Sequence, residues 1–432
     1  MKLDLTKFEV SGRTVAVALS GGKDSMALLE LMKNSQNQFN FTLVAINVEH
    51  GIRGESSLAD SLFVKNYCNT IGVPLYTYSV DAPEYAKQNN LSLEQSARVL
   101  RYQCFYDAIS KGNCDVVATA HHKNDNAESV LFNLFRGSGL KGVSGIKPSY
   151  DDKIIRPLLD FDRKQIDAFI EQNSLPFVTD ETNQLTDYTR NFLRLNVLSE
   201  IEKVFPDAID SIHRFSSIAR EEDEFLDGLA KSYIGLDENV ASISLDLPDP
   251  LMPRAIIIAL KTLGLEKDWE KSHVDETCKL KNLSNGAKIS LPKNIVAFKE
   301  YDKIVIAKKT GDTELSLPFE LGKKTFLDSK ICVELISANV NLKNGFYLDL
   351  DKIPKTAIIR TKQDGDTFTK FGGGTKSLGD YLTDRKIPLR LRDSLPILAD
   401  GKEVLAIFGV AISDKVKVDG ATKNIIKLTR EN

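Results

Sequence analysis

A six-residue segment, SGGKDS at positions 20–25, has the residue types of a phosphate-binding loop. Gly21 and Gly22 lack a Cβ atom, so the backbone can approach a ligand closely there. Ser20 and Ser25 add hydroxyl donors, and the N–H groups at the start of a following helix attract anions. We therefore predict that this segment binds the phosphates of ATP or the pyrophosphate released from it.

Two charged residues within this segment refine the prediction. Lys23 supplies a point charge for a phosphate group. Asp24 is unusual in a pure anion site, and a carboxylate beside phosphates suggests that Mg²⁺ is bound as well. The segment is not a Walker loop, which requires the pattern GxxxxGKS or GxxxxGKT. An ordinary glycine-rich turn between a strand and a helix is the alternative interpretation.

A pair of carboxylates follows a later strand. Asp125 and Glu128 lie three residues apart at a predicted helix N-terminus, directly after His121 and His122. Both carboxylates can face the same space, where they could bind an ammonium group, hold Mg²⁺ or accept a proton. The alternative is helix capping by acidic residues, which the positive end of the helix dipole favours.

Basic residues recur near these segments, and each group could instead be a solvated surface. One group lies on a glycine-bounded loop that could close over a nucleotide, and the others lie on predicted helices or a flexible loop. The residues are His50 and Arg53 on the loop, Arg98 and Arg101 on one helix face, Arg136 in RGSGLKG, and Arg190 and Arg194 four residues apart.

The first 180 residues must form the elements that position these groups. Short apolar runs predict strands, and amphipathic segments between them predict helices. Such alternation indicates an α/β fold with a parallel sheet covered on both faces, whose ligands bind beyond the carboxyl ends of the strands. The predicted strands are 14–19, 42–48, 74–80 and 115–120, and the predicted helices include 25–34, 58–72 and 93–109.

The 432 residues exceed one ordinary domain, so we expect three. Residues 1–205 form a Rossmann-like nucleotide-binding domain, 206–312 a mostly helical middle domain that begins with a linker helix, and 313–432 a small α+β domain. Residues 354–432 carry 15 Lys and Arg against 10 Asp and Glu, a net charge of +5 within a chain of net charge −3. A local basic surface on the last domain is therefore expected, although ordinary scatter gives similar numbers.

Composition excludes several classes of protein. The five cysteines show no CxxC spacing, which argues against a zinc knuckle or a vicinal redox pair, and their scatter suits a reducing cytoplasm. The longest clean apolar run, at 255–260, is far shorter than the roughly 20 residues that span a membrane. We expect a cytoplasmic enzyme without a membrane partner.

Several motifs in order resemble the tRNA(Ile)-lysidine synthetase family of the PP-loop ATP-pyrophosphatase superfamily. They are SGGKDS, HGIR, EQSARVLRY, AHHKNDNAES followed by RGSGLKGVSGI, RPLL at 156–159, DETNQLTDYTRNFLR, and a looser match over 360–398. In the AHHKNDNAES motif, Asn124 and Asn126 replace an aspartate and a glutamine of the family pattern.

The resemblance implies an enzyme that splits ATP into AMP and pyrophosphate and joins free L-lysine to C2 of the wobble cytidine of the CAU-anticodon isoleucine tRNA. The product, lysidine, changes decoding from AUG to AUA. The resemblance also implies that residues 20–25 bind ATP, with Asp24 as a magnesium ligand, and that His50 and Arg53 belong to the nucleotide loop. The resemblance assigns lysine binding and catalysis to Asp125, Glu128 and His122. Contacts to tRNA fall to Arg98, Arg101, Arg136, Arg190, Arg194, Lys376, Arg390 and Arg392.

Other functions remain open at this point, as does a homodimer. A tRNA thiolase of the same superfamily is the nearest alternative, although such enzymes generally use cysteine pairs or clusters. A ligase that forms amides on small molecules would not need a basic carboxyl-terminal domain. A non-catalytic tRNA-binding protein with a degenerate ATP site would not need the intact SGGKDS segment.

Overall fold

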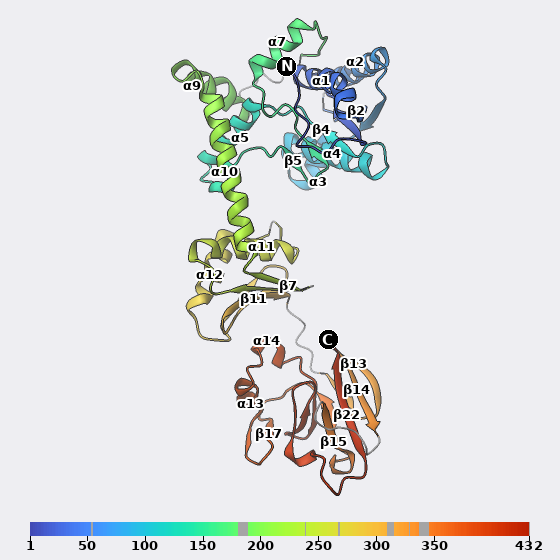
Figure 1. Cartoon of the computed structure of the whole chain (residues 1–432), viewed down its shortest axis with the longest axis vertical. Helices are drawn as coiled ribbons and strands as arrows, with labels where there is room; N and C mark the ends of the chain where they lie inside the picture. The colour runs from blue at the N-terminus through green and yellow to red at the C-terminus, as the bar shows by residue number, and fades with distance from the viewer. Residues whose placement is uncertain are drawn as a thin grey trace. The chain divides into compact units, whose positions relative to one another are not determined.

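The structure is a computed structural model that describes residues 1–52, 55–179, 189–237, 239–266, 268–308, 315–327, 329–336 and 345–431. It separates into two compact units, Met1–Phe225 and Leu226–Asn432 (Figure 1). The three domains expected from the sequence, with boundaries after residues 205 and 312, stay a prediction.

The first unit alternates strands and helices along the chain, as predicted. Its elements are β1 (Thr14–Ala18), α1 (Lys23–Phe39), β2 (Thr42–Glu49), α2 (Glu55–Ile71), β3 (Leu75–Ser79), α3 (Ala82–Asn89), α4 (Leu93–Ser110), β4 (Val116–Ala118), α5 (Lys123–Phe135), α6 (Leu140–Val143), β5 (Ser149–Tyr150), β6 (Ile154–Ile155), α7 (Arg163–Gln172), α8 (Thr189–Phe192), a π-helical segment (Leu193–Leu198), α9 (Ser199–Val204) and the start of α10 (Ala208–Lys231).

Six strands form one sheet in the order β3-β2-β1-β4-β6-β5. All neighbours are parallel except β5 and β6, which confirms the predicted parallel sheet. The chain moves outward in one direction from β1 through β2 to β3, and β4 then pairs with the other side of β1. The gap between β1 and β4 is therefore a topological switch point, and ligands of such sheets bind at the carboxyl ends of the strands there.

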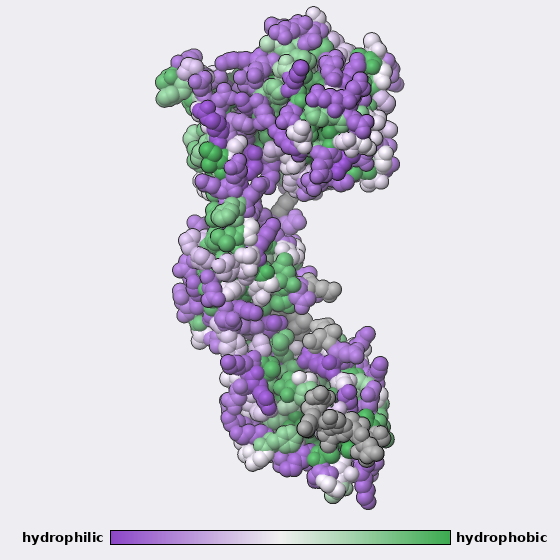
Figure 2. Space-filling model, viewed as in Figure 1, coloured by the Kyte–Doolittle hydropathy of each residue, from purple (hydrophilic) through white to green (hydrophobic). Residues whose placement is uncertain are grey.

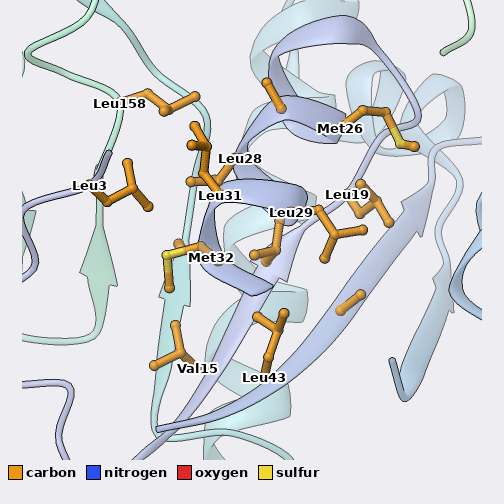
Figure 3. Packing of buried hydrophobic residues seen from close by; sticks show 14 of the residues in the cluster. Leu3, Val15, Leu19, Met26, Leu28, Leu29, Leu31, Met32, Leu43 and Leu158 are labelled. Atoms are coloured by element: carbon orange, nitrogen blue, oxygen red, sulfur yellow. The ribbon is translucent and has the colours of Figure 1, made fainter. Parts of the chain in front are cut away.

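Helices cover both faces of this sheet because successive strand residues point to opposite sides. Val15 and Val17 of β1 pack in a buried cluster with α1, and Ala16 between them packs in a second cluster with Phe105 of α4. Figure 3 shows Met32 of α1 directed towards Val15. The sheet core thus holds β1 and its carboxyl end in a rigid frame.

The second unit contains α+β structure. Its elements are β7 (Ile234–Asp237), β8 (Val240–Ser244), α11 (Met252–Thr262), α12 (Lys271–Lys279), β9 (Lys288–Leu291), β10 (Ile295–Glu300), β11 (Lys303–Lys308), β12 (Ser316–Pro318), β13 (Gly322–Phe326), β14 (Ser329–Ile336), β15 (Phe346–Asp349), β16 (Ile358–Arg360), β17 (Thr367–Thr369), β18 (Thr375–Ser377), α13 (Leu378–Asp384), α14 (Leu389–Arg392), β19 (Ile397–Asp400), β20 (Glu403–Ile407), β21 (Ala411–Ile412) and β22 (Ile425–Glu431), with short 3-10 turns between them.

Three sheets organise these elements. The helices expected in the middle region are present as α10, α11 and α12, together with an antiparallel sheet of order β7-β8-β11-β10-β9. The apolar face of α11 packs with this sheet through Ala255, Ile256 and Ala259. The carboxyl-terminal region has a seven-stranded sheet that includes β12 and β16 to β21, and a four-stranded sheet of order β13-β14-β22-β15.

The surface in view is mostly hydrophilic, with hydrophobic residues in small groups (Figure 2). In the described ranges, no helix combines the length and the apolar character that crossing a membrane requires.

Candidate active site

The SGGKDS segment connects β1 to α1 at the switch point. Gly21 has φ +85°, a conformation that favours glycine, and a Cβ atom there would make a tight contact of 3.2 Å with a methyl group of Val64. The carbonyl of Gly21 accepts a hydrogen bond from the amide of Val178 at 2.9 Å. These contacts hold the segment at the N-terminus of a 17-residue helix, where the helix dipole favours an anion.

Hydroxyl groups close the turn of this segment. The Oγ atoms of Ser20 and Ser25 lie 3.2 Å apart, and Ser25 donates a hydrogen bond to the carbonyl of Gly22 at 2.8 Å. Lys23 pairs with Asp167 at 2.9 Å, and both side chains are more than a third exposed. Since exposed ion pairs are weak, a phosphate oxygen can compete for the Lys23 ammonium group.

His122 lies between the segment that follows β1 and the segment that follows β4. It follows β4 at the N-cap of α5 and is almost fully buried, with 1% exposure. Its Nε2 atom lies 3.7 Å from a carboxylate oxygen of Asp24 and 3.6 Å from one of Asp125. Asp125 also accepts a hydrogen bond from the His122 amide at 3.0 Å. The phosphate loop and the carboxylate segment, about 100 residues apart in the chain, thus meet at one imidazole.

The charges in this cluster stabilise one another. Burial acts to raise the pKa of Asp24, but hydrogen bonding and charge from His122, together with Arg163 and Arg194, outweigh burial and lower the pKa of Asp24 below its ordinary value. Burial acts to lower the pKa of His122, but Asp125 and Asp24 outweigh it and raise that pKa above its ordinary value. The cluster therefore favours an ionised Asp24 beside a protonated His122.

Glu128 lies one helical turn after Asp125 and is 3% exposed. Arg194 donates to both of its carboxylate oxygens, at 2.6 and 3.2 Å, and also lies 3.5 Å from Asp125. Burial raises the pKa of Glu128, and Arg194 opposes this only in part. Arg194 is therefore directed at the two carboxylates, and its expected contact with tRNA stays a prediction.

The loop after β2 contributes His50. Its Nε2 atom lies 3.3 Å from Nε of Arg101, so the Arg101 side chain contacts the histidine of this loop. Burial, with the charge of Arg101, lowers the pKa of His50 to about 4. Burial likewise lowers the pKa of His121, whose Nδ1 atom lies 2.9 Å from the Thr119 hydroxyl. His50 and His121 are therefore neutral near pH 7.

The contact between His50 and Arg101 predicts how His50 titrates. NMR of its imidazole protons should give a midpoint near 4, well below the ordinary value of about 6.5, and Arg101→Gln should move the midpoint upward. Between pH 4 and 6.5 the unfolded chain binds a proton that the folded chain excludes, so His50 lowers stability as the pH falls through this window. A midpoint near 6.5 that Arg101→Gln leaves unchanged would contradict the contact.

The other basic residues predicted to contact tRNA have separate contacts within their own unit or lie outside the described residues. Arg136 lies 5.1 Å from the ring centroid of Phe132. Arg53 and the side chain of Arg190 lie outside the part of the chain that the structure describes. In the second unit, Lys376 pairs with Asp384 at 2.6 Å and Arg390 lies 2.8 Å from Glu300.

Arg392 is placed differently from its prediction as a phosphate contact. It is 8% exposed and donates to the carbonyl of Ile387 at 2.8 Å and to the hydroxyl of Thr383 at 3.0 Å. These donors point into the domain, so Arg392 joins α13 to α14 and is left out of the tRNA surface that we propose below.

Three residues of the site region were not predicted from the sequence. The charge of Arg163 helps to lower the pKa of Asp24. Asn124 accepts a hydrogen bond from the Arg163 amide at 3.0 Å, at the start of α7. Asn126 is fully buried and bridges Ser216 of α10 at 2.8 Å to the amide of Ile146 at 2.7 Å. Both asparagines thus position α5, and only their departure from the family pattern had singled them out.

Comparison with known proteins decides the family. Residues 2–201 match the PP-loop domain family, and residues 357–428 match the family described as the TilS substrate C-terminal domain. The protein named tRNA(Ile)-lysidine synthase from Caldanaerobacter subterraneus subsp. tengcongensis is 33% identical, over 96% of this chain and 94% of its own length. The chain belongs to the tRNA(Ile)-lysidine synthase family. Proteins of the same name from Clostridium tetani and Clostridium acetobutylicum are each 32% identical, over 97% and 96% of this chain and 95% of their own lengths.

Membership of the tRNA(Ile)-lysidine synthase family agrees with the site at the switch point. The PP-loop match contains the SGGKDS segment, Asp125, Glu128 and Arg194, and it implies that the enzyme uses ATP. The match over 357–428 contains Lys376 and the other basic residues of that region. The family resemblance inferred from the motifs is therefore confirmed.

Proposed function

We propose that this enzyme joins free L-lysine to C2 of the wobble cytidine of the CAU-anticodon isoleucine tRNA, at the expense of ATP, and so converts the decoding of that tRNA from AUG to AUA. The observation that carries the proposal is the meeting of Asp24 and Asp125 at His122. A phosphate loop alone would suit many ATP enzymes. The adjoining carboxylates of Asp125 and the buried Glu128 provide a place for an ammonium group, which lysine brings.

The first step activates the base. The carbonyl oxygen at C2 attacks the α-phosphorus of ATP, the bond from that phosphorus to the bridging oxygen breaks, and pyrophosphate leaves. The loop at 20–25, the N-terminus of α1 and Lys23 would receive the charge that develops on pyrophosphate. Because these donors are held by the turn before the reaction begins, little reorganisation is needed.

The second step forms the new carbon–nitrogen bond. The ε-amine of lysine, whose ordinary pKa is about 10.4, must lose a proton before it attacks C2. Asp125 and Glu128 would hold the ammonium group, and the raised pKa of the buried Glu128 suits it to accept the proton. AMP then leaves with the oxygen that it had activated, and lysidine remains on the tRNA.

A magnesium ion fits this site through Asp24. In the described residues, no three His, Cys, Asp or Glu side chains gather closely enough to hold a metal by themselves. Enzymes commonly bind Mg²⁺ through one or two carboxylates together with the phosphates of the substrate. The ionised Asp24 at the phosphate loop would supply such a carboxylate, and the ion would neutralise phosphate charge.

Sulfur transfer, the chemistry of a tRNA thiolase, is the less favoured candidate. It needs a thiolate, and burial raises the pKa of both Cys68 and Cys114 to about 11. Cys104 is buried as well, and its pKa is also raised. The cysteines of the first unit therefore suit a structural role, and their free state suits a cytoplasmic enzyme.

Incorporation of labelled lysine into tRNA tests the proposed function directly. The enzyme, ATP, magnesium and a CAU-anticodon isoleucine tRNA transcript should yield labelled lysidine on nucleoside analysis, with one pyrophosphate released for each lysine. A transcript with uridine in place of the wobble cytidine is the matched control and should take up no label. Pyrophosphate release without lysine in the nucleoside fraction would reject the reaction.

We further propose that residues 313–432 contact the tRNA backbone and that residues 1–205 carry the chemistry, with 206–312 between them. The possible homodimer expected from the sequence stays a prediction.

The carboxyl-terminal contacts predict a salt-dependent effect. The double variant Lys376→Gln and Lys386→Gln should weaken binding of the tRNA and lower the slope of log affinity against log salt by about two, since each phosphate contact contributes about one. ATP binding should not change. Lys355→Gln, which alters an exposed lysine that is not among the predicted tRNA contacts, is the control. An unchanged slope would remove both lysines from the tRNA surface.

A further inference from the structure

A hollow of about 360 Å³ opens on the first unit, beside α5. It is lined by Arg98 of α4, by Ser129 and Phe132 of α5, and by Lys147, Tyr150 and Arg156 of the segment around β5 and β6. Its volume is within the range of small-ligand sites. The proposed chemistry uses none of these side chains.

The charge of the hollow selects an anion. Three cations line it, and none of its lining residues, all within the described ranges, is acidic. The lining therefore offers no carboxylate to the ammonium group of lysine. Arg98 is exposed and has its guanidinium 5.3 Å from the ring centroid of Tyr102, and Lys147 forms an exposed ion pair with Glu224 at 3.1 Å.

Arg156 has unused donor capacity. It is 6% exposed, donates to the carbonyl of Lys147 at 2.6 Å and approaches the hydroxyl of Tyr102 at 3.4 Å. Its Nε has no hydrogen-bond partner within the described part of the chain. Because Arg156 lines the hollow and its guanidinium group carries a positive charge, an anion there would gain a charge-assisted contact with this residue.

Aromatic rings accompany these charges. Tyr150, which is 49% exposed, and Phe132 both line the hollow, and Arg136 lies 5.1 Å from the centroid of the Phe132 ring. Proteins bind single-stranded RNA by stacking unpaired bases on aromatic rings while cations contact the phosphates. The combination therefore fits an unpaired nucleotide better than inorganic phosphate alone.

The position of the hollow indicates which nucleotide. Glu128 and Phe132 are four residues apart on α5 and so lie on one helix face, about 6 Å apart along the axis. That separation is comparable with the span of one extended nucleotide. We propose that the hollow holds the nucleotide adjacent to the modified cytidine, with its base against Tyr150 and Phe132 and its phosphate on Arg98 and Arg156. This inference rests on the proposed function, because it requires the cytidine to lie at Glu128.

A double-mutant cycle between a side chain and a base tests the inference. Dissociation constants are measured for the full-length wild type and for Tyr150→Ala, each with the intact CAU-anticodon tRNA and with transcripts that are abasic at the 5′ or the 3′ neighbour of the wobble cytidine. One of the two abasic sites should weaken wild-type binding about tenfold, the size of a lost stacking contact, and should have no further effect in Tyr150→Ala. Tyr150→Phe should behave as the wild type.

Tyr106→Ala is the matched control, because Tyr106 is 37% exposed on α4 and does not line the hollow. It should show the full abasic effect. If both abasic sites weaken Tyr150→Ala as much as the wild type, the inference is wrong. Lysine incorporation by the wild type, measured in parallel, separates the two proposals: incorporation without coupling overturns only the inference, whereas absence of incorporation overturns the proposed function.

Discussion

Replacement of Asp24 by asparagine should lower tRNA-dependent pyrophosphate release by about 10²–10³-fold, the usual loss when one preorganised electrostatic group is removed from an active site. The carboxylate of Asp24 lies 3.7 Å from His122, and both charges are stabilised in the folded state. Asparagine keeps the size of the side chain but removes the negative charge that helps to raise the pKa of His122 and that would bind magnesium. Release is measured with ATP, lysine and the isoleucine tRNA.

Asp107→Asn is the matched control for this experiment. Asp107 forms an exposed ion pair with Lys111 on α4 at 2.7 Å, and such pairs contribute little to stability. Its pyrophosphate release should equal that of the wild type. Release by Asp24→Asn at the rate of the control would refute the assignment of the 20–25 segment as the pyrophosphate site.

Glu128→Gln should separate the two steps of the reaction. Pyrophosphate release in a single turnover should stay close to the wild-type rate, whereas lysine transfer should fall at least about 10²-fold, because glutamine cannot accept the proton of the ammonium group. The fold should persist, since Arg194 keeps Asp125 at 3.5 Å and is not left as a buried charge without a partner. The adenylated tRNA should therefore accumulate.

Quench experiments that follow pyrophosphate and labelled lysine on the same sample would measure both steps. Glu171→Gln, which changes an exposed glutamate of α7, should affect neither step. Equal loss of both steps in Glu128→Gln would reject its role towards the amine and would indicate that the Glu128–Arg194 pair supports the whole site.

Much of the first unit could be predicted because its signals are local. The strand predicted at 14–19 is observed as Thr14–Ala18, and the helix predicted at 93–109 as Leu93–Ser110. Ser92 and Gln95 form a capping box at the start of that helix, and such a pattern acts over a single turn. The conformation of Gly21 likewise follows from its own residue type and its place between a strand and a helix.

The sequence by itself determined the family, the first four strands of the first unit with helices between them, and the residues that could contact phosphate or an amine. Only the tertiary structure decided the partners of the long polar side chains. Arg194 meets Glu128 across 66 residues, and Asn126 meets Ser216 across 90. Arg392 turns inward, although its sequence position suggested a surface contact. No local pattern contains this information, because the partner and the burial of a charged group depend on which distant segments pack around it, and burial in turn sets the pKa.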